Sequence, residues 1–439
     1  MIRHDVKRMT ATACALTLVL AAAGLAQSSA SPAAKKSVAI RAGKLIDGKS
    51  DNAIANALIL VEDGKIASVT PGGSPPSGVE VIDLSNATVL PGLIDAHTHI
   101  LLQGDVTEED YDVQLLKQSI PYRAILAARN AKIALEHGFT ALRDLETEGA
   151  MYADVDVKTA INRGEVPGPR LFVSTRAMAP TGMYPLLGFS WELELPHGVQ
   201  PVDGVEGARL AVREQLSHGA DWIKYYSDHG YHYEADGLLH GIVNFTDDEA
   251  RAIVDETHRL GHRVAAHAIS SDGIAAALRA GVDSVEHGDG LTDAEIDEIA
   301  RKGTYWVPTV MVGAAVAPGR GGNWIKMVNT ERDAFGRALK KNVKIVFGTD
   351  AGGFAWTEMN ETQEFHYYVE YGMTPMQAIR TATSSAAELL GWSDRIGSIE
   401  PGKYADLIAV TSDPLKDIKA LDNVSFVMKE GVVYKNEMK

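Results

Sequence analysis

Between residues 91 and 395, short apolar segments alternate with segments in which apolar residues recur every three or four positions. The short segments are typical of buried parallel strands, and the periodic ones are typical of amphipathic helices. Several helical segments end on glycine, a common helix C-terminus, as in "VEGARLAVREQLSHG" and "TDAEIDEIARKG". The strand segments are eight: LIDAHTH, TALRDLE, RLFVSTRA, DWIKYYSD, RVAAHAIS, DSVEHGD, YWVPTVM and KIVFGTD.

Eight strand–helix units in this order predict an α/β protein with a (β/α)8 TIM-like barrel over residues 91–395. A doubly wound open sheet is the alternative, because it has the same alternation of strands and helices. In either fold the carboxyl ends of the strands gather at one edge or mouth. Polar residues at these ends are therefore the first candidates for a functional site.

The two ends of the chain have a different pattern. Residues 37–90 contain short β-like segments separated by Gly, Asp, Asn and Pro, and similar text returns over residues 396–439 in "GSIEPGKYADLIAVTSDP" and "VSFVMKEGVVYKN". Each part is too small to bury a core of its own. We therefore expect one small β-sandwich domain built from both chain ends, with the barrel inserted between them.

Residues 1–30 have the features of a signal peptide: a basic start, an apolar stretch from about residue 11 to 25, and small residues suited to cleavage. A membrane anchor is the alternative, but the apolar stretch is shorter than the roughly 20 residues that a spanning helix needs. No later stretch reaches that length. The sequence therefore predicts export to the periplasm or beyond the cell, without a stable membrane anchor.

Cysteine content and net charge exclude several kinds of site and partner. The single cysteine, Cys14, lies inside the predicted signal peptide, so the mature protein has no thiol for a disulfide, a metal or a nucleophile. Any metal site must use His, Asp, Glu or Lys. A net charge of −16 without a basic tract in the body of the chain argues against nucleic acid as a partner.

Six polar side chains interrupt the predicted strands or follow them directly. Since all six are expected at one mouth of the barrel, they predict a site for Zn²⁺ or another borderline divalent metal. A single buried histidine is commonly a hydrogen-bonded core residue, and an Asp before small residues commonly caps a turn. The convergence, together with two histidines spaced to share one face of a strand, favours the metal site. The residues are His97, His99, Lys224, His267, His287 and Asp350.

Lys224 determines which kind of metal site is expected. One reading is a buried ion pair with Asp221 or Asp228. The other is that burial and nearby cations remove its proton, so that the neutral amine adds carbon dioxide and becomes a carbamate. A carbamate has two anionic oxygens and is able to bridge two metal ions.

These motifs resemble the amidohydrolase superfamily, and within it the binuclear, peptidase-like branch. The resemblance rests on "PGLIDAHTH", "WIKYYSDHGY", "VAAHA", "SVEHGD", "GTDAG" and "GSIEPGKYADLIAV", and it covers nearly the whole mature chain. It implies that His97 and His99 bind the more buried metal, His267 and His287 the second, and carboxylated Lys224 both. It also implies hydrolysis by a metal-bridging hydroxide, with Asp350 as a ligand that moves protons, and a homo-oligomeric assembly.

The stretch "KYYSDHGYHYEADG" resembles relatives that cleave Xaa-Pro and other dipeptides or N-acyl amino acids, including the phenylalanine amide of ochratoxin A. Such substrates carry a carboxylate beside the scissile amide. Tyr231 is the candidate for holding that carboxylate or the tetrahedral oxyanion, and Arg143 and Arg176 are cationic alternatives. The loop "APTGMYPLLGFSWELELPHG" is expected to supply an apolar wall or an oligomer contact through Met183, Leu186, Leu187, Phe189 and Trp191.

Two other functions remain open from the sequence. The alternative is a cyclic amide or lactone hydrolase, since the β-like text at the chain ends also resembles imidazolone-opening enzymes. Lys224 disfavours deamination and imidazolone ring opening themselves, because the mononuclear deaminases of the superfamily lack this lysine. The remote alternative is a non-catalytic, exported metal-binding protein on a barrel that has lost its activity.

Overall fold

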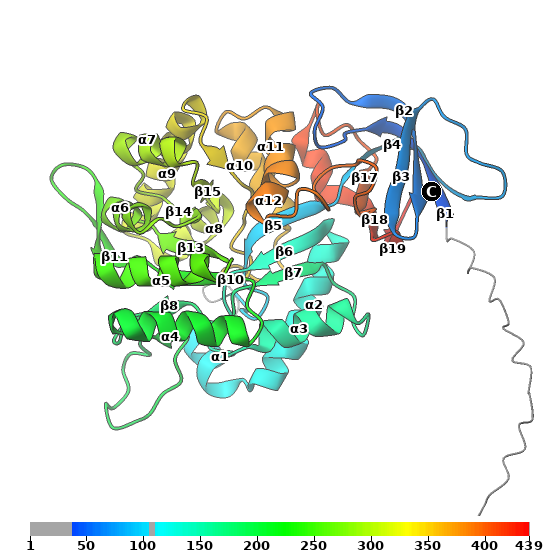
Figure 1. Ribbon diagram of the computed structural model, residues 1–439. Helices are drawn as coiled ribbons and strands as arrows, with labels where there is room; N and C mark the ends of the chain where they lie inside the picture. Colours follow the sequence, from blue (N-terminus) through cyan, green and yellow to red (C-terminus); the bar gives the residue numbers. More distant parts are fainter. Residues whose placement is uncertain (1–36, 105–109, 439) are drawn as a thin grey trace, which may run out of the picture. The chain divides into compact units, whose positions relative to one another are not determined.

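The computed structural model describes residues 37–104 and 110–438 (Figure 1). The predicted signal peptide and Cys14 lie outside the described residues. Among the residues that are described, no helix combines the length and the apolar character needed to cross a membrane.

The eight strands predicted between residues 91 and 395 are all present, and each hydrogen-bonded pair among them is parallel. Their interior positions are almost entirely buried, as expected for strands covered by helices on the outside. The strands are β5 (Leu93–Thr98), β6 (Phe139–Asp144), β7 (Arg170–Val173), β10 (Trp222–Tyr226), β13 (Arg263–Ala268), β14 (Ser284–His287), β15 (Tyr305–Val307) and β16 (Lys344–Ile345).

Hydrogen bonds across the two remaining gaps close the strands into a ring. The backbone N–H of Asp221, just before β10, donates to the carbonyl of Val173 at 2.7 Å, which joins β7 to β10. On the other side, the N–H of Ala96 donates to the carbonyl of Phe347 at 2.9 Å, so the chain following β16 pairs with β5. The closed arrangement supports the predicted barrel and excludes the doubly wound open sheet.

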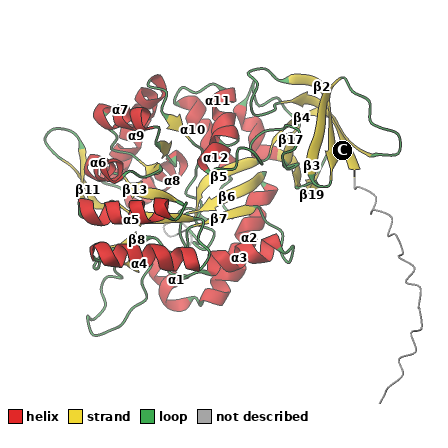
Figure 2. Ribbon diagram, in the orientation of Figure 1, coloured by secondary structure: helices red, strands yellow, loops and turns green. Residues whose placement is uncertain are grey.

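Helices surround these strands in Figure 2. The predicted helix starts and ends are explained by capping: Thr246 and Thr292 each form a capping box with the glutamate three residues later, and Gly281 and Gly303 end helices with φ of 92° and 73°. The helices are α1 (Tyr111–Lys117), α2 (Ile120–Glu136), α3 (Ala153–Asn162), α4 (Gly204–Ser217), α5 (Asp247–Arg259), α6 (Ser271–Ala280), α7 (Asp293–Lys302), α8 (Val310–Arg320), α9 (Asn323–Lys340), α10 (Glu364–Glu370), α11 (Pro375–Thr381) and α12 (Ser384–Leu389), with 3-10 turns η1 (Glu361–Gln363) and η2 (Ile418–Asn423).

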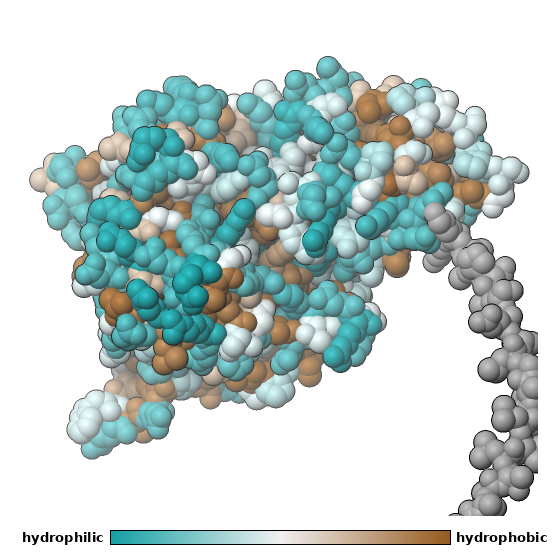
Figure 3. All heavy atoms as spheres, in the orientation of Figure 1, coloured by the Kyte–Doolittle hydropathy of each residue, from teal (hydrophilic) through white to brown (hydrophobic). Residues whose placement is uncertain are grey.

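The outer faces of these helices are mainly hydrophilic on the side seen in Figure 3, with apolar residues scattered among the polar ones. The apolar faces point inward, where residues such as Ala208, Ile253, Ile274 and Ile299 are fully buried in the same hydrophobic core as the strands. This division explains the three- to four-residue periodicity of the sequence.

Strands from both ends of the chain pair in one seven-stranded sheet. The joining contact is between β4 and β17, which pair antiparallel with Val89 opposite Ala409. Ile40, Leu407 and Phe426 are buried in a hydrophobic core on this sheet. The pairing of both ends is as expected, whereas the two-layered sandwich stays a prediction. The strands, in spatial order, are β19 (Val432–Asn436), β18 (Val424–Lys429), β17 (Leu407–Val410), β4 (Glu80–Pro91), β1 (Ser37–Leu45), β2 (Ile54–Glu62) and β3 (Lys65–Pro71).

Short strands also form where the sequence analysis expected only loops. β8 (Met178–Ala179) and β9 (Gln200–Pro201) extend the barrel sheet next to β10. After β10, β11 (Asp228–Tyr233) and β12 (Leu239–Val243) form an antiparallel hairpin. The hairpin matters for function because it carries Tyr231.

Candidate metal centre

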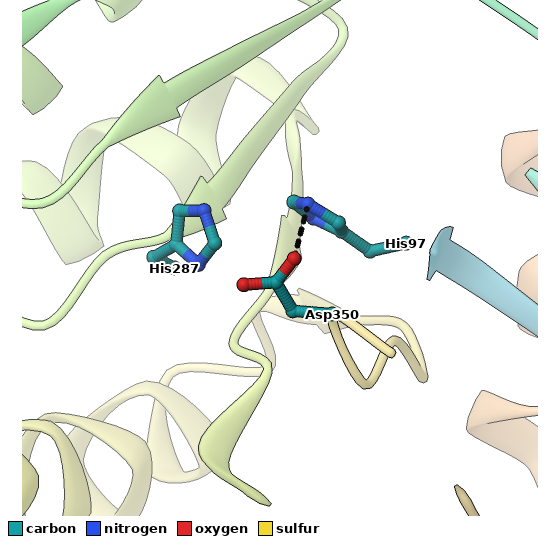
Figure 4. A group of neighbouring side chains, drawn as sticks. All are labelled: His97, His287 and Asp350. Atoms are coloured by element: carbon teal, nitrogen blue, oxygen red, sulfur yellow. Dashed lines mark ion pairs between the residues drawn. The ribbon is translucent and has the colours of Figure 1, made fainter. Parts of the chain in front are cut away.

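The six predicted ligands gather at the carboxyl ends of the barrel strands. His97 lies in β5, Lys224 in β10 and His267 in β13, while His287 ends β14. The ring centroids of His97 and His287 are 4.9 Å apart, and those of His267 and His287 are 4.5 Å apart. Asp350 lies between His97 and His287 in Figure 4. Five of the six predicted ligands line one cavity: His99, Lys224, His267, His287 and Asp350.

Hydrogen bonds fix which ring nitrogen of each histidine faces the centre. Nδ1 of His97 contacts Glu286 Oε2 at 2.9 Å, and Nδ1 of His287 contacts Thr309 Oγ1 at 2.8 Å. Nδ1 of His99 lies 3.4 Å from the carbonyl oxygen of Glu146. In all three residues these contacts leave Nε2 for the centre, which is the arrangement that orients histidines as metal ligands.

One buried nitrogen atom shows that the residues fit a metal ion. Among the described residues, Nε2 of His97 has no hydrogen-bond partner. It lies 3.5 Å from Asp350 Oδ1, which is also 3.0 Å from His99 Nε2. Burying such an atom without a partner is costly, and imidazole and carboxylate are ligands that Zn²⁺ and similar ions accept. A divalent cation bound here would satisfy all three side chains.

The ionisation of the histidines is consistent with this fit. Burial lowers the pKa of His97 well below its ordinary value and that of His287 to about 3, so both imidazoles are neutral. Burial also lowers the pKa of His99, but the hydrogen bond and charge of Asp350 outweigh it and raise the pKa to about 9. A metal ion must therefore displace the proton of His99, and metal binding should weaken as the pH falls.

Lys224 is buried among these groups, with an exposure of 1%. Neither of the ion pairs considered from the sequence forms: Asp221 binds Lys158 at 2.5 Å, and Asp228 accepts hydrogen bonds from Ser270. Within residues 37–104 and 110–438, Lys224 has no ion-pair partner. Burial lowers the pKa of its ammonium group, which favours the neutral amine that carboxylation requires.

Tyr231 reaches the site from the β11–β12 hairpin. Its hydroxyl lies 2.8 Å from Nε2 of His267 and 3.3 Å from Asp228 Oδ1. Because Tyr231 occupies Nε2, the atom of His267 that is left for a metal ion is Nδ1. The predicted catalytic tyrosine is therefore adjacent to the predicted ligands, although its role stays a prediction.

The other substrate-binding candidates lie elsewhere. Arg143 is fully buried in an ion pair with Glu286 at 2.9 Å, and Arg176 donates to the carbonyl of Val199 at 3.3 Å; neither lines the cavity. Leu187 and Trp191, at the tip of the loop predicted to form an apolar wall or an oligomer contact, are 77% and 91% exposed and do not line the cavity, so the oligomer contact stays a prediction for them. From that loop, Tyr184 lines the cavity instead.

Several charged residues of the cavity were not foreseen. Glu148 and Asp289 follow β6 and β14 by a few positions, so their place after a strand was a usable signal. Arg320 ends α8 and Glu331 lies within α9, where the sequence offers no mark that separates a cavity residue from a solvated one.

Glu286 holds the most buried part of the centre together. It accepts from His97 Nδ1 and from Arg143 Nη2, and all three side chains are fully buried. We expect Glu286→Gln to weaken metal binding by roughly 10- to 100-fold, because the orientation and basicity of His97 depend on this carboxylate. The metal-free protein should lose about 3 kcal/mol of unfolding free energy, since the buried guanidinium of Arg143 loses its counter-charge.

Metal titration and denaturant unfolding measure the two effects of Glu286→Gln separately. Glu206→Gln is a matched control, because Glu206 is exposed on α4. Unchanged metal affinity in Glu286→Gln would show that His97 needs no support from this carboxylate.

Comparison with known proteins identifies the family. Residues 88–434 match the model of the amidohydrolase family. An ochratoxinase of Aspergillus niger is 31% identical over 429 residues, covering 90% of this chain and 86% of that protein. The crystal structure of a Xaa-Pro dipeptidase with bound methionine superposes with a TM-score of 0.82 at 35% identity, covering 91% of this chain and 100% of that one. An imidazolonepropionase of Salinispora tropica is 27% identical over 367 residues, covering 80% of this chain and 85% of that protein.

The chain therefore belongs to the amidohydrolase family and is a hydrolase that acts on carbon–nitrogen bonds. This confirms the family and the enzyme class that the motifs predicted. The family generally uses a binuclear metal centre, and the described residues offer two groups of potential ligands: His97, His287 and Asp350, and His99, Glu146 and Glu148.

Proposed function

We propose that the protein is a binuclear metal-dependent amidohydrolase that cleaves the amide bond of dipeptides or N-acyl amino acids. The observation that carries the proposal is the buried Nε2 of His97 beside Asp350, which has no hydrogen-bond partner among the described residues. The same site contains a buried lysine without an ion-pair partner in the described chain. We also propose that the protein is exported. Its chain ends, residues 37–90 and 396–439, would together form one small β-sandwich domain, and the barrel of residues 91–395 is inserted between them in the sequence.

In this proposal His97, His99 and Asp350 would hold one divalent metal ion, with Zn²⁺ as the first choice, and His267 and His287 would hold the other. The amine of Lys224 would add carbon dioxide: a nitrogen–carbon bond forms, one proton leaves, and the resulting carbamate would be a further anionic ligand. When bound, the two ions supply a water nucleophile of lowered pKa and polarise the scissile carbonyl.

The side chains of the protein move the protons. Asp350 takes a proton from the attacking water and passes it to the leaving nitrogen, so that the departing amine is neutral. The hydroxyl of Tyr231, held beside His267, donates a hydrogen bond to the oxygen that gains charge or to the substrate carboxylate. Arg320, which lines the same cavity, is a cation for that carboxylate.

The substrate class is supported by the relatives. The chain is similar both to an ochratoxinase, at 31% identity, and to a Xaa-Pro dipeptidase, at 35% identity. A second candidate, hydrolysis of a cyclic amide or lactone, is supported by the 27% identity to an imidazolonepropionase. The two candidates differ in substrate and share the barrel and its site.

A substrate panel tests the proposal. Metal-replete protein is expected to release an amino acid from at least one of Xaa-Pro, Xaa-Phe and N-acyl-Phe substrates, with two metal equivalents per chain by elemental analysis. Removal of the metal by chelation should abolish turnover, and Zn²⁺ should restore it. Turnover of lactams or lactones alone would favour the second candidate, and no turnover of either class would favour a non-catalytic protein.

In the same panel, Tyr231→Phe separates the two roles of the tyrosine. A loss of roughly 100- to 1,000-fold in kcat indicates an oxyanion donor. A higher KM with unchanged kcat indicates a carboxylate contact. Unchanged kcat and KM would exclude both roles.

A further inference from the structure

The cavity of the metal centre has an acidic part that the proposed reaction does not use. Glu331 of α9 and Asp289, two residues after His287, line the same cavity as the predicted ligands. Glu331 is only 2% exposed and Asp289 only 7%. Among the described residues, Oε1 of Glu331 is buried without a hydrogen-bond partner. A buried carboxyl oxygen without a partner is rare, so a partner from the substrate is a natural candidate.

The surroundings of Glu331 disfavour a negative charge that has no partner. Burial raises the pKa of Glu331 well above its ordinary value, and the neighbouring charges of Asp289 and Glu364 raise it further. A positive group beside Glu331 would favour its ionised form.

Apolar side chains line the cavity together with the two acids. Ile269, Val312, Val316 and Trp324 all contribute to its wall. This combination suits a long side chain with an aliphatic stem and a charged end, because the stem packs against apolar surface while the end pairs with carboxylates.

We propose that Asp289 and Glu331 bind a positively charged side chain of the substrate, so that the enzyme prefers amides of arginine or lysine. This inference rests on the proposed function and specifies its substrate. Guanidinium has a planar array of donors that two carboxylates can share, whereas ammonium binds as a point charge. The same pocket would leave the carboxyls unpaired with a neutral side chain, which disfavours neutral substrates.

Matched dipeptides test the inference on the full-length, metal-loaded enzyme. Ala-Arg and Ala-citrulline have nearly the same shape but differ in charge. The expected kcat/KM is roughly 10- to 100-fold higher for Ala-Arg, the range of charge-assisted hydrogen bonds. Glu331→Gln and Asp289→Asn should each reduce this ratio by about 10-fold or more. Asp333→Asn, an exposed position on the same helix, should leave the ratio unchanged.

Each contrary result has a distinct meaning. No turnover of any amide overturns the proposed function itself. Equal turnover of Ala-Arg and Ala-citrulline by the wild-type enzyme overturns only the cation site, as does an equal loss on both substrates in Glu331→Gln. If the substitution acts only when the substrate has a free α-amino group, as tested with N-acetyl-Ala-Arg, the acids bind that group and the side-chain proposal is wrong.

A measurement on the wild-type enzyme covers the case in which the variants do not fold. Free L-arginine should inhibit competitively at a concentration at least about 10-fold below that of L-citrulline, because only arginine carries the guanidinium charge. Equal inhibition by the two amino acids would overturn the proposal.

Discussion

Asp350→Asn is expected to lower kcat by roughly 100- to 10,000-fold while the protein stays folded, because an amide cannot take up and return the proton that the reaction transfers. The Asp350 carboxylate lies 3.0 Å from His99 Nε2 and 3.5 Å from His97 Nε2, so it is placed directly beside two of the predicted ligands. Asp350 also has a positive φ of 57°. Asparagine tolerates this conformation better than other residues do, so the substitution is mild for the backbone.

The loss in Asp350→Asn should be in the chemical step. Steady-state kinetics at saturating metal, metal analysis and thermal unfolding together separate a lost proton carrier from a lost ligand. Asp394→Asn is the matched control, since Asp394 is exposed. If Asp350→Asn retained more than about a tenth of the wild-type kcat at full metal content, the role of Asp350 in proton transfer would be excluded.

The ends of the barrel strands were the most predictable part of the site. His97, Lys224, His267 and His287 lie in strands of four to six residues whose apolar pattern is visible in the sequence. Once the strands are recognised as parallel, barrel geometry places their carboxyl ends at one mouth, whatever the helices do. The prediction needed only local pattern and one rule of topology.

The walls of the cavity were less predictable, because they depend on how helices and loops pack over the mouth. Glu331 has the sequence surroundings of an ordinary surface position of an amphipathic helix, yet its side chain is buried. Trp191 shows the reverse: this apolar loop residue, predicted to lie in a pocket wall or in an oligomer contact, is almost fully exposed. Tertiary packing decides both, and periodicity carries no information about it.

The side chains that orient the histidines also depend on tertiary packing and were not predictable from local sequence. Glu286 precedes His287 directly in β14, and its contact with His97 of β5 joins two strands that do not pair with each other, so it depends on the closure of the whole barrel. Thr309 contacts His287 from the turn that starts α8, and no sequence motif predicts this contact.

Lys224→Ala is expected to lower kcat/KM by at least roughly 100-fold, because the proposed carbamate would bind the metal directly, whereas loss of an outer contact costs only about 10- to 100-fold. The variant should bind fewer than two metal equivalents. Lys224→Arg keeps a positive charge, but a guanidinium does not form a carbamate, so it should be equally inactive. Lys340→Ala, at an exposed position of α9, is the control.

Rescue of Lys224→Ala by a small carboxylic acid tests whether Lys224 acts as a carbamate. Truncation to alanine leaves space where the carbamate would lie, and acetate or propionate offers the same two oxygens to the metal ions. We therefore expect partial recovery of activity in Lys224→Ala but none in Lys224→Arg, where the longer side chain fills the space. Intact mass measured under non-denaturing conditions should show the wild-type chain heavier by one carbon dioxide. An unmodified lysine in fully active enzyme would show that the buried amine itself, and no carbamate, completes the centre.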